Sequence, residues 1–204
     1  DANRPVGPVP TDVDVFDPCF APVVAHHPQL ERLATGAIWS EGPVWIAEDD
    51  SVLWSDIPND RMLRWSATDG MRVWRERVEF TNGHTRDLDG TILHCSHGLR
   101  AVFRTNVDGS EQRIVVDRWE GRRFNAPNDI VVRSDGTIWF TDPPYGLIIP
   151  EEGHGGESEI GDCYVFRHDP RTGAIEPVTA LPEHPNGLAF SPDESLLYVS
   201  DTSG

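Results

Sequence analysis

A repeat of similar segments is the feature that most constrains the fold of this chain. Each repeat opens on an acidic or amide residue and closes on a polar residue at the end of a short apolar run. The opening and closing residues are Glu41 and Asp56, Asn82 and Ser96, Asn128 and Asp142, and Asn186 and Asp201. Their separations are 15, 14, 14 and 15 positions. Self-similarity at a fixed period is typical of solenoids and propellers.

Each repeat has the pattern of short β-strands joined by tight turns. In the third repeat the apolar run 130–132 is followed by Asp135-Gly136 and a second run at 137–140, and Asp-Gly between such runs indicates a hairpin. Third strands are predicted at 62–65, 101–104 and 163–167, and a fourth at 112–116. Four short antiparallel strands in about 40 to 50 residues make a propeller blade. We therefore expect an all-β β-propeller with blades beginning near residues 38, 80, 126 and 184.

The two ends of the chain fall outside complete blades. Residues 1–36 are rich in proline and have no sustained period, so we expect an N-terminal arm laid over the main body, with the propeller spanning 37–204. The fourth unit has only its first two strands before Gly204, which gives about three and a half blades. Half a blade leaves open sheet edges. We therefore expect a fragment of a longer chain, the alternative being completion by partner segments.

Composition argues against several classes of partner. Lys plus Arg number 17 against 34 Asp plus Glu, a formal net charge of −17, which repels nucleic acid and anionic lipid. No run of about 18 apolar residues exists, so no membrane span is expected. The three cysteines are widely spaced and indicate neither a disulfide framework nor a CxxC metal site. The first residue is Asp1, not Met, which favours an exported or periplasmic protein, with a cytoplasmic one as the alternative. The oligomeric state stays unknown.

The opening residues of the repeats form a candidate metal site. In a propeller, equivalent positions on the innermost strands encircle the central channel, and all four opening residues offer a side-chain oxygen. One carboxylate and several amide carbonyls form a hard, oxygen-rich donor set that suits Ca²⁺ better than zinc, with other divalent cations possible. The spacing alone supports an alternative equally well, because Asn-Gly and Asn-Asp are common turn pairs and these side chains could cap turns.

Five stretches give the chain a family resemblance that covers almost all of residues 36–204. It resembles the SMP-30/gluconolactonase/regucalcin-like family of propeller hydrolases. The stretches are Ser40-Glu41-Gly42-Pro43-Val44-Trp45, Trp54-Ser55-Asp56-Ile57-Pro58, Arg123-Phe124-Asn125-Ala126-Pro127-Asn128-Asp129, Phe140-Thr141-Asp142-Pro143-Pro144-Tyr145-Gly146 and Pro185-Asn186-Gly187-Leu188-Ala189-Phe190-Ser191-Pro192-Asp193. The resemblance implies a six-bladed propeller with one axial divalent cation, usually calcium, and hydrolysis of a small-molecule lactone of the sugar-acid kind.

The resemblance also implies roles for particular residues. Glu41 and Asn186 look like direct metal ligands, and Asn128 looks like a ligand or a group that contacts both metal and substrate. The family's remaining ligand, an aspartate that also serves as general base, is expected some 40 to 60 residues beyond Asn186 and so beyond Gly204. The catalytic residue is therefore unknown within this chain.

Other residues are weaker candidates for the site. Asp201 is a candidate base, although an aspartate at a repeated strand end more often accepts backbone hydrogen bonds. His97 is a second catalytic candidate and, by the resemblance, a residue of the substrate pocket, with a surface or core histidine as the alternative. Asn82 faces the channel and is expected to bind substrate. Arg123 is expected to bind a substrate carboxylate or hydroxyl, unless it is an ordinary surface arginine.

Two further groups of residues are interpreted as structural. The acidic, glycine-rich stretch 150–161, which includes Glu151, Glu152 and His154, is expected to be a solvated lid and not a metal site. The 7 tryptophans fall mostly on strands and are expected to pack the blades.

Two functions remain open from the sequence. The first is an enzyme that hydrolyses a lactone or, with less support, a phosphoester or aryl ester. An axial cation would polarise the carbonyl and a carboxylate would activate water. The second is a non-catalytic binding propeller of the NHL or YWTD kind. The ring of Glu41, Asn128 and Asn186 favours the enzyme, since a binding propeller has no need for these side chains to converge.

Overall fold

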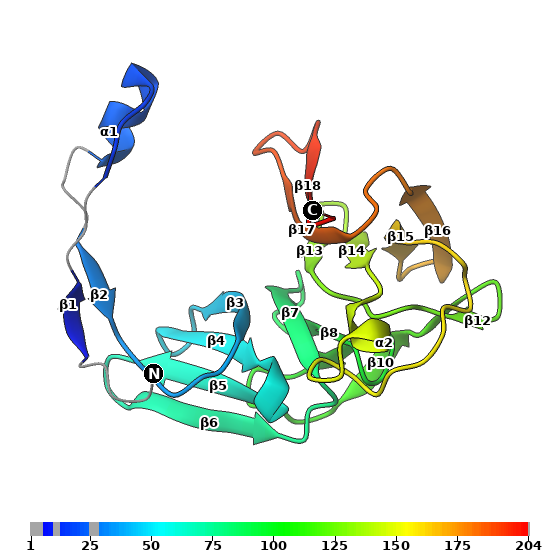
Figure 1. The fold of residues 1–204 in the computed structure, drawn as a ribbon, viewed down its shortest axis with the longest axis horizontal. Coiled ribbons are helices and arrows are strands. Elements are labelled where there is room, and N and C mark those ends of the chain that lie inside the picture. The colour runs from blue at the N-terminus through cyan, green and yellow to red at the C-terminus, as the bar shows by residue number, and fades with distance from the viewer. Residues whose placement is uncertain (1–5, 10–12, 25–28, 204) are drawn as a thin grey trace.

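The computed structural model describes residues 6–9, 13–24 and 29–203, and nearly all of its regular structure is β-strand, which confirms the all-β prediction. In the described residues, three four-stranded antiparallel sheets and a final two-stranded sheet follow one another along the propeller, and two separate two-stranded sheets lie outside this series. In Figure 1 the sheets of this series are arranged in an arc. This is the arrangement expected for about three and a half blades of a propeller.

The strands of each sheet follow chain order from the innermost to the outermost. The first sheet holds β3 (Ser40–Ile46), β4 (Ser51–Asp56), β5 (Arg61–Ser66) and β6 (Gly70–Glu76). The second holds β7 (Thr81–Arg86), β8 (Ile92–Ser96), β9 (Ala101–Thr105) and β10 (Arg113–Val116). The third holds β13 (Ile130–Val132), β14 (Ile138–Asp142), β15 (Tyr164–Asp169) and β16 (Ala174–Thr179). The fourth holds β17 (Pro185–Phe190) and β18 (Leu197–Asp201).

Short polar motifs form the hairpin turns between the two inner strands. In the third sheet, Asp135 Oδ1 accepts hydrogen bonds from the Thr137 amide at 2.9 Å and from its hydroxyl at 2.6 Å. Between them Gly136 has a φ of +84°, a left-handed conformation that glycine adopts without a Cβ penalty. Asp89 and Thr91 repeat the same two bonds in the second sheet at 2.9 and 2.6 Å. The Asp-Gly-Thr sequence thus forms the turn by local chemistry.

The hydrophobic core lies between the faces of neighbouring sheets. One cluster packs the first sheet against the second and consists of Ile46, Leu53, Met62, Val78, Ile92 and Phe103. A larger cluster packs the second against the third and consists of Leu93, Cys95, Val102, Phe124, Ile130, Ile138, Phe140, Ile160 and Phe166. Each sheet therefore depends on its neighbours to bury its apolar face, as the stacking of repeats requires.

The remaining elements are short. The N-terminal segment holds β1 (Gly7–Val9), a 3₁₀ turn η1 (Pro18–Phe20), α1 (Ala21–Val24) and β2 (Leu30–Arg32), and elsewhere lie η2 (Ile57–Asn59), β11 (Arg118–Trp119), β12 (Arg122–Arg123) and α2 (Tyr145–Ile148). Within the described residues, no helix is long and apolar enough to cross a membrane.

The N-terminal arm lies differently from the prediction. In Figure 1 α1 and the β1–β2 pair extend away from the sheets, and η1 and α1 bury no residue. The end of the arm, residues 33–36, lines a cavity with the first sheet. The expectation that the arm covers the main body is therefore wrong for its described part before residue 33. Residues 1–5, 10–12 and 25–28 of the arm lie outside the described residues.

Candidate functional site

The innermost strands bring the four opening residues of the repeats together. Glu41 lies on β3, Asn82 on β7 and Asn186 on β17, and Asn128 precedes β13, where its amide still bonds to the Thr141 carbonyl at 2.9 Å. All four line one cavity of about 220 Å³. We call these four residues the polar ring. The other residues that line this ring cavity are Trp39, Ile57, Tyr145, Ile149, Glu152 and Thr202.

The amides of the polar ring bond to one another from blade to blade. Asn82 Nδ2 donates to Asn128 Oδ1 at 2.6 Å, and Asn128 Nδ2 donates to Asn186 Oδ1 at 3.0 Å. Asn82 and Asn128 are buried, at 4% and 2% exposure. These bonds run between side chains of different sheets and not to the turns of their own strands. The arrangement therefore favours a convergent site over the turn-capping alternative.

The electrostatic character of the ring is negative. The Glu41 carboxylate accepts a hydrogen bond from Trp39 Nε1 at 2.9 Å. Burial, with the charge of Glu41 as a further cause, raises the pKa of Asp129, which lines a second cavity of about 220 Å³ bordered by the same ring. No lysine, arginine or histidine is among the described residues that line either cavity. Such a site attracts a cation.

The donors of the ring are mostly amides. Among the residues that the structure describes, no group of three or more His, Cys, Asp or Glu side chains is placed to hold a metal ion. The oxygens on offer are the Glu41 carboxylate and the side-chain carbonyls of Asn82, Asn128 and Asn186. Those of Asn128 and Asn186 each already accept one amide hydrogen bond. Hard oxygen donors of this kind suit Ca²⁺ or Mg²⁺, whereas zinc and copper prefer imidazole and thiolate.

His97 lies behind the ring and orients its amides. It is 1% exposed, and burial lowers its pKa to about 4, so its imidazole is neutral near pH 7. Nδ1 lies 3.0 Å from the Glu152 carbonyl, which can only accept, so Nδ1 carries the proton. Nε2 then accepts from Asn82 Nδ2 at 3.4 Å and also lies 3.3 Å from Asn128 Oδ1. Both hydrogens of the Asn82 amide nitrogen are thereby engaged, which leaves its oxygen for the cavity.

Glu152 was missed by the sequence analysis. It was expected within a solvated lid, but it is 5% exposed and lines the ring cavity. Its pKa is raised by burial first and by the charges of Glu41 and Glu151 second. The neighbouring Gly153 explains the burial, because a Cβ at that position would lie 2.2 Å from the Gly146 carbonyl oxygen. The glycine next to the acid was the signal in the sequence.

Three other cavity residues were also missed. Trp39 was expected to pack a blade, but it is 49% exposed and holds Glu41 at the cavity. Tyr145, on α2, hydrogen-bonds through its hydroxyl to Thr202, and both border the cavity. An indole, a phenol and a hydroxyl at the mouth are suited to a ligand with hydroxyl groups.

Two predicted site residues lie away from both cavities. Asp201 accepts backbone hydrogen bonds from Glu183 at 3.0 Å, His184 at 3.1 Å and Ser203 at 2.9 Å. The Arg123 guanidinium donates to the Leu99 carbonyl at 3.0 Å. Neither residue is among those that line the ring, and their roles stay predictions from the sequence.

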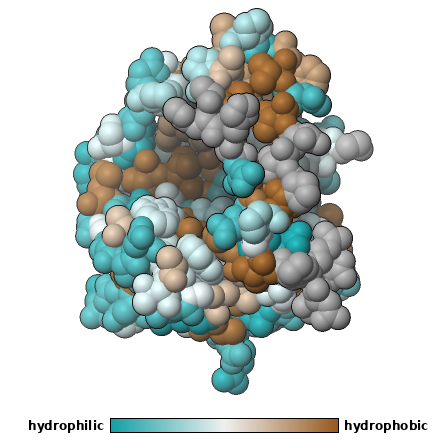
Figure 2. Space-filling view, turned by 90° about the vertical axis from the view of Figure 1, so that its left-hand side faces the viewer, coloured by the Kyte–Doolittle hydropathy of each residue, from teal (hydrophilic) through white to brown (hydrophobic). Residues whose placement is uncertain are grey.

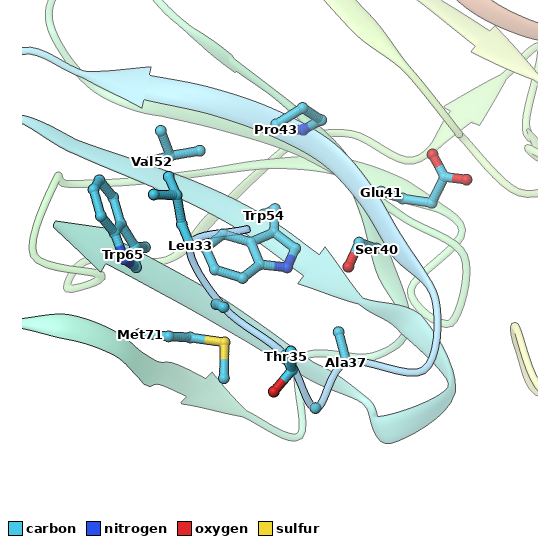
Figure 3. A pocket seen from close by; sticks show the side chains of 12 residues that line it. Leu33, Thr35, Ala37, Ser40, Glu41, Pro43, Val52, Trp54, Trp65 and Met71 are labelled. Carbon is cyan, nitrogen blue, oxygen red and sulfur yellow. The ribbon is translucent and has the colours of Figure 1, made fainter. Parts of the chain in front are cut away.

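A larger cavity of about 420 Å³ lies on the other side of β3. Figure 3 shows Trp54, Trp65 and Met71 along its wall, with the carboxylate of Glu41 directed away from them. Figure 2 shows a hollow with brown, hydrophobic side chains on the face at the left of Figure 1. This cavity is an apolar face of the first sheet and is separate in character from the ring.

Comparisons with known proteins agree with this architecture. The chain is 34% identical over 200 residues to a gluconolactonase of Zymomonas mobilis, which covers 92% of this chain and 55% of that protein. The solved structure of a gluconolactonase from Xanthomonas campestris superposes with a TM-score of 0.88 at 40% identity, covering 98% of this chain and 68% of that one. A calcium-binding regucalcin from Agrobacterium tumefaciens, at 18% identity and a TM-score of 0.61, covers 82% of this chain and 52% of that one and shares the fold.

The chain spans about half the length of the Zymomonas relative, 55% of it. The family described as SMP-30/Gluconolactonase/LRE-like region matches residues 39–204, which include every sheet of the propeller and all four ring residues. This match and the 0.88 superposition show that the chain belongs to the SMP-30/gluconolactonase/LRE-like family.

Proposed function

We propose that this protein hydrolyses lactones of sugar acids at the polar ring, with a divalent cation, Ca²⁺ in the first place, held by Glu41, Asn128 and Asn186. The observation that carries the proposal is the convergence of the ring on one cavity. The similarity to gluconolactonases of two bacteria supports the reaction class. A 25% identical pentonolactonase from Haloferax volcanii supports the wider class of sugar lactones.

The residues of the ring fit such a cation. Glu41 provides one formal negative charge, and Asn128 and Asn186 provide neutral oxygens that are already within 3.0 Å of a neighbouring amide nitrogen. Each of these two oxygens accepts one amide hydrogen bond and has a second lone pair left for a cation. A bound cation would polarise the lactone carbonyl and stabilise the oxyanion that forms.

The other cavity residues are suited to bind and orient the substrate. Asn82 presents its amide oxygen, since its nitrogen is engaged by Asn128 and His97. Glu152 and Tyr145 face the same cavity from the loop after β14, and a carboxylate and a phenol are good partners for sugar hydroxyls. Trp39 provides an apolar wall beside Glu41.

The proton acceptor is not assigned within the described residues. Asp201, the candidate named from the sequence, is occupied by three backbone amides, and these bonds hold its pKa at about 2. A carboxylate with so low a pKa is a weak base near neutral pH. We therefore retain the expectation of an aspartate on the inner strand of the next blade.

Hydrolysis of glucono-1,5-lactone by the purified protein, with and without a chelator, tests the proposal. We expect the activity to vanish with EDTA and to return with Ca²⁺. Glu41→Gln should lose both Ca²⁺ binding and hydrolysis. Glu176→Gln is the matched control, because Glu176 lies 61% exposed on β16. Hydrolysis that survives complete metal removal, or an unchanged Glu41→Gln variant, would overturn the mechanism. Ca²⁺ binding without hydrolysis of any sugar lactone would favour the binding propeller.

A further inference from the structure

Two histidines lie buried side by side in the second sheet, outside the ring cavity. His84 on β7 is 5% exposed and His94 on β8 is fully buried. Their Nδ1 atoms are 2.8 Å apart, and the two residues are directly paired across the strands. A buried polar pair is costly unless every member is hydrogen-bonded, so its partners decide what it does.

The fold itself does not require polar side chains at this place. The corresponding first regular pair beyond the ring residue is apolar in the other three sheets. The pairs are Val44 with Leu53, Ile130 with Phe140, and Leu188 with Val199. The histidine pair is therefore a departure confined to the second sheet, the sheet that contributes Asn82.

The hydrogen bonds around the pair run in one direction. Ser55 Oγ lies 2.9 Å from the Asn82 carbonyl oxygen, which can only accept, so the hydroxyl donates there. Ser55 Oγ must then accept from His84 Nε2, also at 2.9 Å. Burial lowers the pKa of His84 to about 3 and that of His94 well below its usual value, so both rings are neutral. His94 therefore donates through Nδ1 to His84 and accepts through Nε2 from the Thr105 hydroxyl at 2.9 Å.

This chain of hydrogen bonds ends on the backbone carbonyl of Asn82, and a strand of the first sheet packs closely against the same carbonyl. A Cβ on Gly42 would lie 2.4 Å from the Asn82 carbonyl oxygen, so β3 closes one side of it and Ser55 holds another. The fourth sheet has a simpler version, in which the Thr141 hydroxyl donates to the Asn186 carbonyl at 2.7 Å and accepts from the Asp129 amide at 3.1 Å. In both places a second partner fixes the direction of the hydroxyl.

We propose that the buried chain Thr105–His94–His84–Ser55 is a positioning device for Asn82, which it holds at the distance from which the amide contacts the substrate. The four residues act through Asn82 and touch neither substrate nor metal. The inference rests on the proposed function, since it assigns the substrate contact to the Asn82 side of the ring and the metal to the other side. It predicts that loss of this hydrogen-bond chain weakens substrate binding and leaves the bound metal in place.

The test uses variants that keep the packing. The double variant H84I/H94F copies the apolar pair of the third sheet, and Ser55→Ala breaks the last bond. Both should raise the KM for glucono-1,5-lactone about tenfold, the effect of one misplaced hydrogen bond of ~1.4 kcal/mol. The kcat should change less than threefold and the Ca²⁺ affinity less than twofold. Ser55→Thr, which retains a hydroxyl as Thr141 does, should restore the KM.

Three outcomes would overturn the proposal. An unchanged KM in a folded H84I/H94F variant would make the pair ordinary core. A loss of Ca²⁺ affinity as large as the rise in KM would mean that the hydrogen-bond chain supports the whole polar ring and not Asn82 alone. Imidazole nitrogen NMR provides a readout that needs no activity, and we expect His84 with its proton on Nε2 and His94 with its proton on Nδ1 at neutral pH. The opposite tautomers would overturn the proposed hydrogen-bond chain even if the protein proved not to be a lactonase. The proposed function alone would be refuted if the wild-type protein were inactive but had these tautomers, and if the Asn82 side-chain amide signal shifted in Ser55→Ala.

Discussion

The inner strands of the second and third sheets approach closely at Gly83, and this contact predicts how much stability the variant Gly83→Ala loses. A Cβ on Gly83 would lie 2.5 Å from the Asn128 carbonyl oxygen and 2.7 Å from Asp129 Oδ1. The Gly83 amide also donates to that carbonyl at 2.8 Å. Gly83→Ala must therefore push the third sheet outward and break this bond. Overpacking costs about 1–3 kcal/mol and a lost hydrogen bond about 0.5–1.5 kcal/mol, which together give about 1.5–4.5 kcal/mol.

Two other glycines separate the causes. Gly173 has a φ of +74° and open space around its Cβ position, so Gly173→Ala measures the left-handed conformation alone, about 1–2 kcal/mol. Gly42 combines a φ of +59° with a contact at 2.4 Å, so Gly42→Ala should be the most destabilising, at about 2–5 kcal/mol.

Urea unfolding and calcium titration of the three variants provide the measurements. For a chain of this size, the loss in Gly83→Ala corresponds to a Tm lower by about 5–15 °C. Because Asn128 moves with the strand, Gly83→Ala should also weaken Ca²⁺ binding, whereas Gly173→Ala should not. If Gly83→Ala loses no more stability than Gly173→Ala and binds Ca²⁺ normally, the inner strands do not approach as closely as the structure indicates.

Three further predictions concern single side chains. Glu152→Gln should lower kcat/KM for glucono-1,5-lactone about tenfold while leaving Tm unchanged or raised, because a neutral amide replaces a buried carboxylate; kinetics and thermal melts check both, and a lower Tm would refute the reasoning. Stability should decrease as the pH falls below about 6.5, because the unfolded chain binds protons that two buried histidines do not: His84, with a folded pKa of about 3, and His94, with a pKa well below its usual value. Each contributes a slope of ~1.4 kcal/mol per pH unit, and urea unfolding at several pH values should show a shallower slope in H84I/H94F. Asp56→Ala removes the acceptor of the Ile38 and Trp39 amides, at 2.9 and 3.2 Å, and should cost about 2–4 kcal/mol; an unchanged urea midpoint would show that these amides find other partners.

Much of the fold could be predicted because its determinants are local. The Asp-Gly-Thr turns form through bonds between residues two positions apart, and strand alternation places the apolar side chains on the faces that pack. The offsets between repeats then identify equivalent positions without any knowledge of long-range contacts. For this reason the ring of Glu41, Asn82, Asn128 and Asn186 was predicted as a group.

The residues that were missed depend on contacts between distant parts of the chain. Glu152 reaches the ring cavity because the loop after β14 folds back, and its carbonyl meets His97, 55 positions away in the sequence. The position of the N-terminal arm likewise depends on packing and not on a local pattern. A glycine beside an acid, such as Gly153, marks a close approach, but the sequence does not say what is approached.

The last two residues of the second strand of a sheet show how the polar ring is held in place. They are Ser55-Asp56 in the first sheet and Thr141-Asp142 in the third. Of the aspartates at the end of the second strand, Asp201 was predicted from the sequence as a candidate base. In the structure such an aspartate accepts from the backbone amides that come just before the ring residue of its own sheet, as Asp142 does from Asn125 and Ala126, both at 2.8 Å. The hydroxyl beside it reaches forward to the next ring residue, as Thr141 does to Asn186 at 2.7 Å. The first sheet has the same two links, since Asp56 accepts from the Ile38 and Trp39 amides and Ser55 donates to the Asn82 carbonyl. The first and third sheets therefore each hold their own ring position and that of the next sheet.

A ring held by identical links would offer a cation the same environment on every side. A lactone is asymmetric, so its recognition requires at least one blade to differ. The second sheet differs in three ways. A histidine pair replaces an apolar pair, Cys95 stands where the other sheets have a hydroxyl residue, and Ser96 stands where they have aspartate. Ser96 donates to the Glu79 carbonyl at 2.6 Å, which places His97 beside the ring. The departures from the repeat thus gather around Asn82, on the side where we place the substrate.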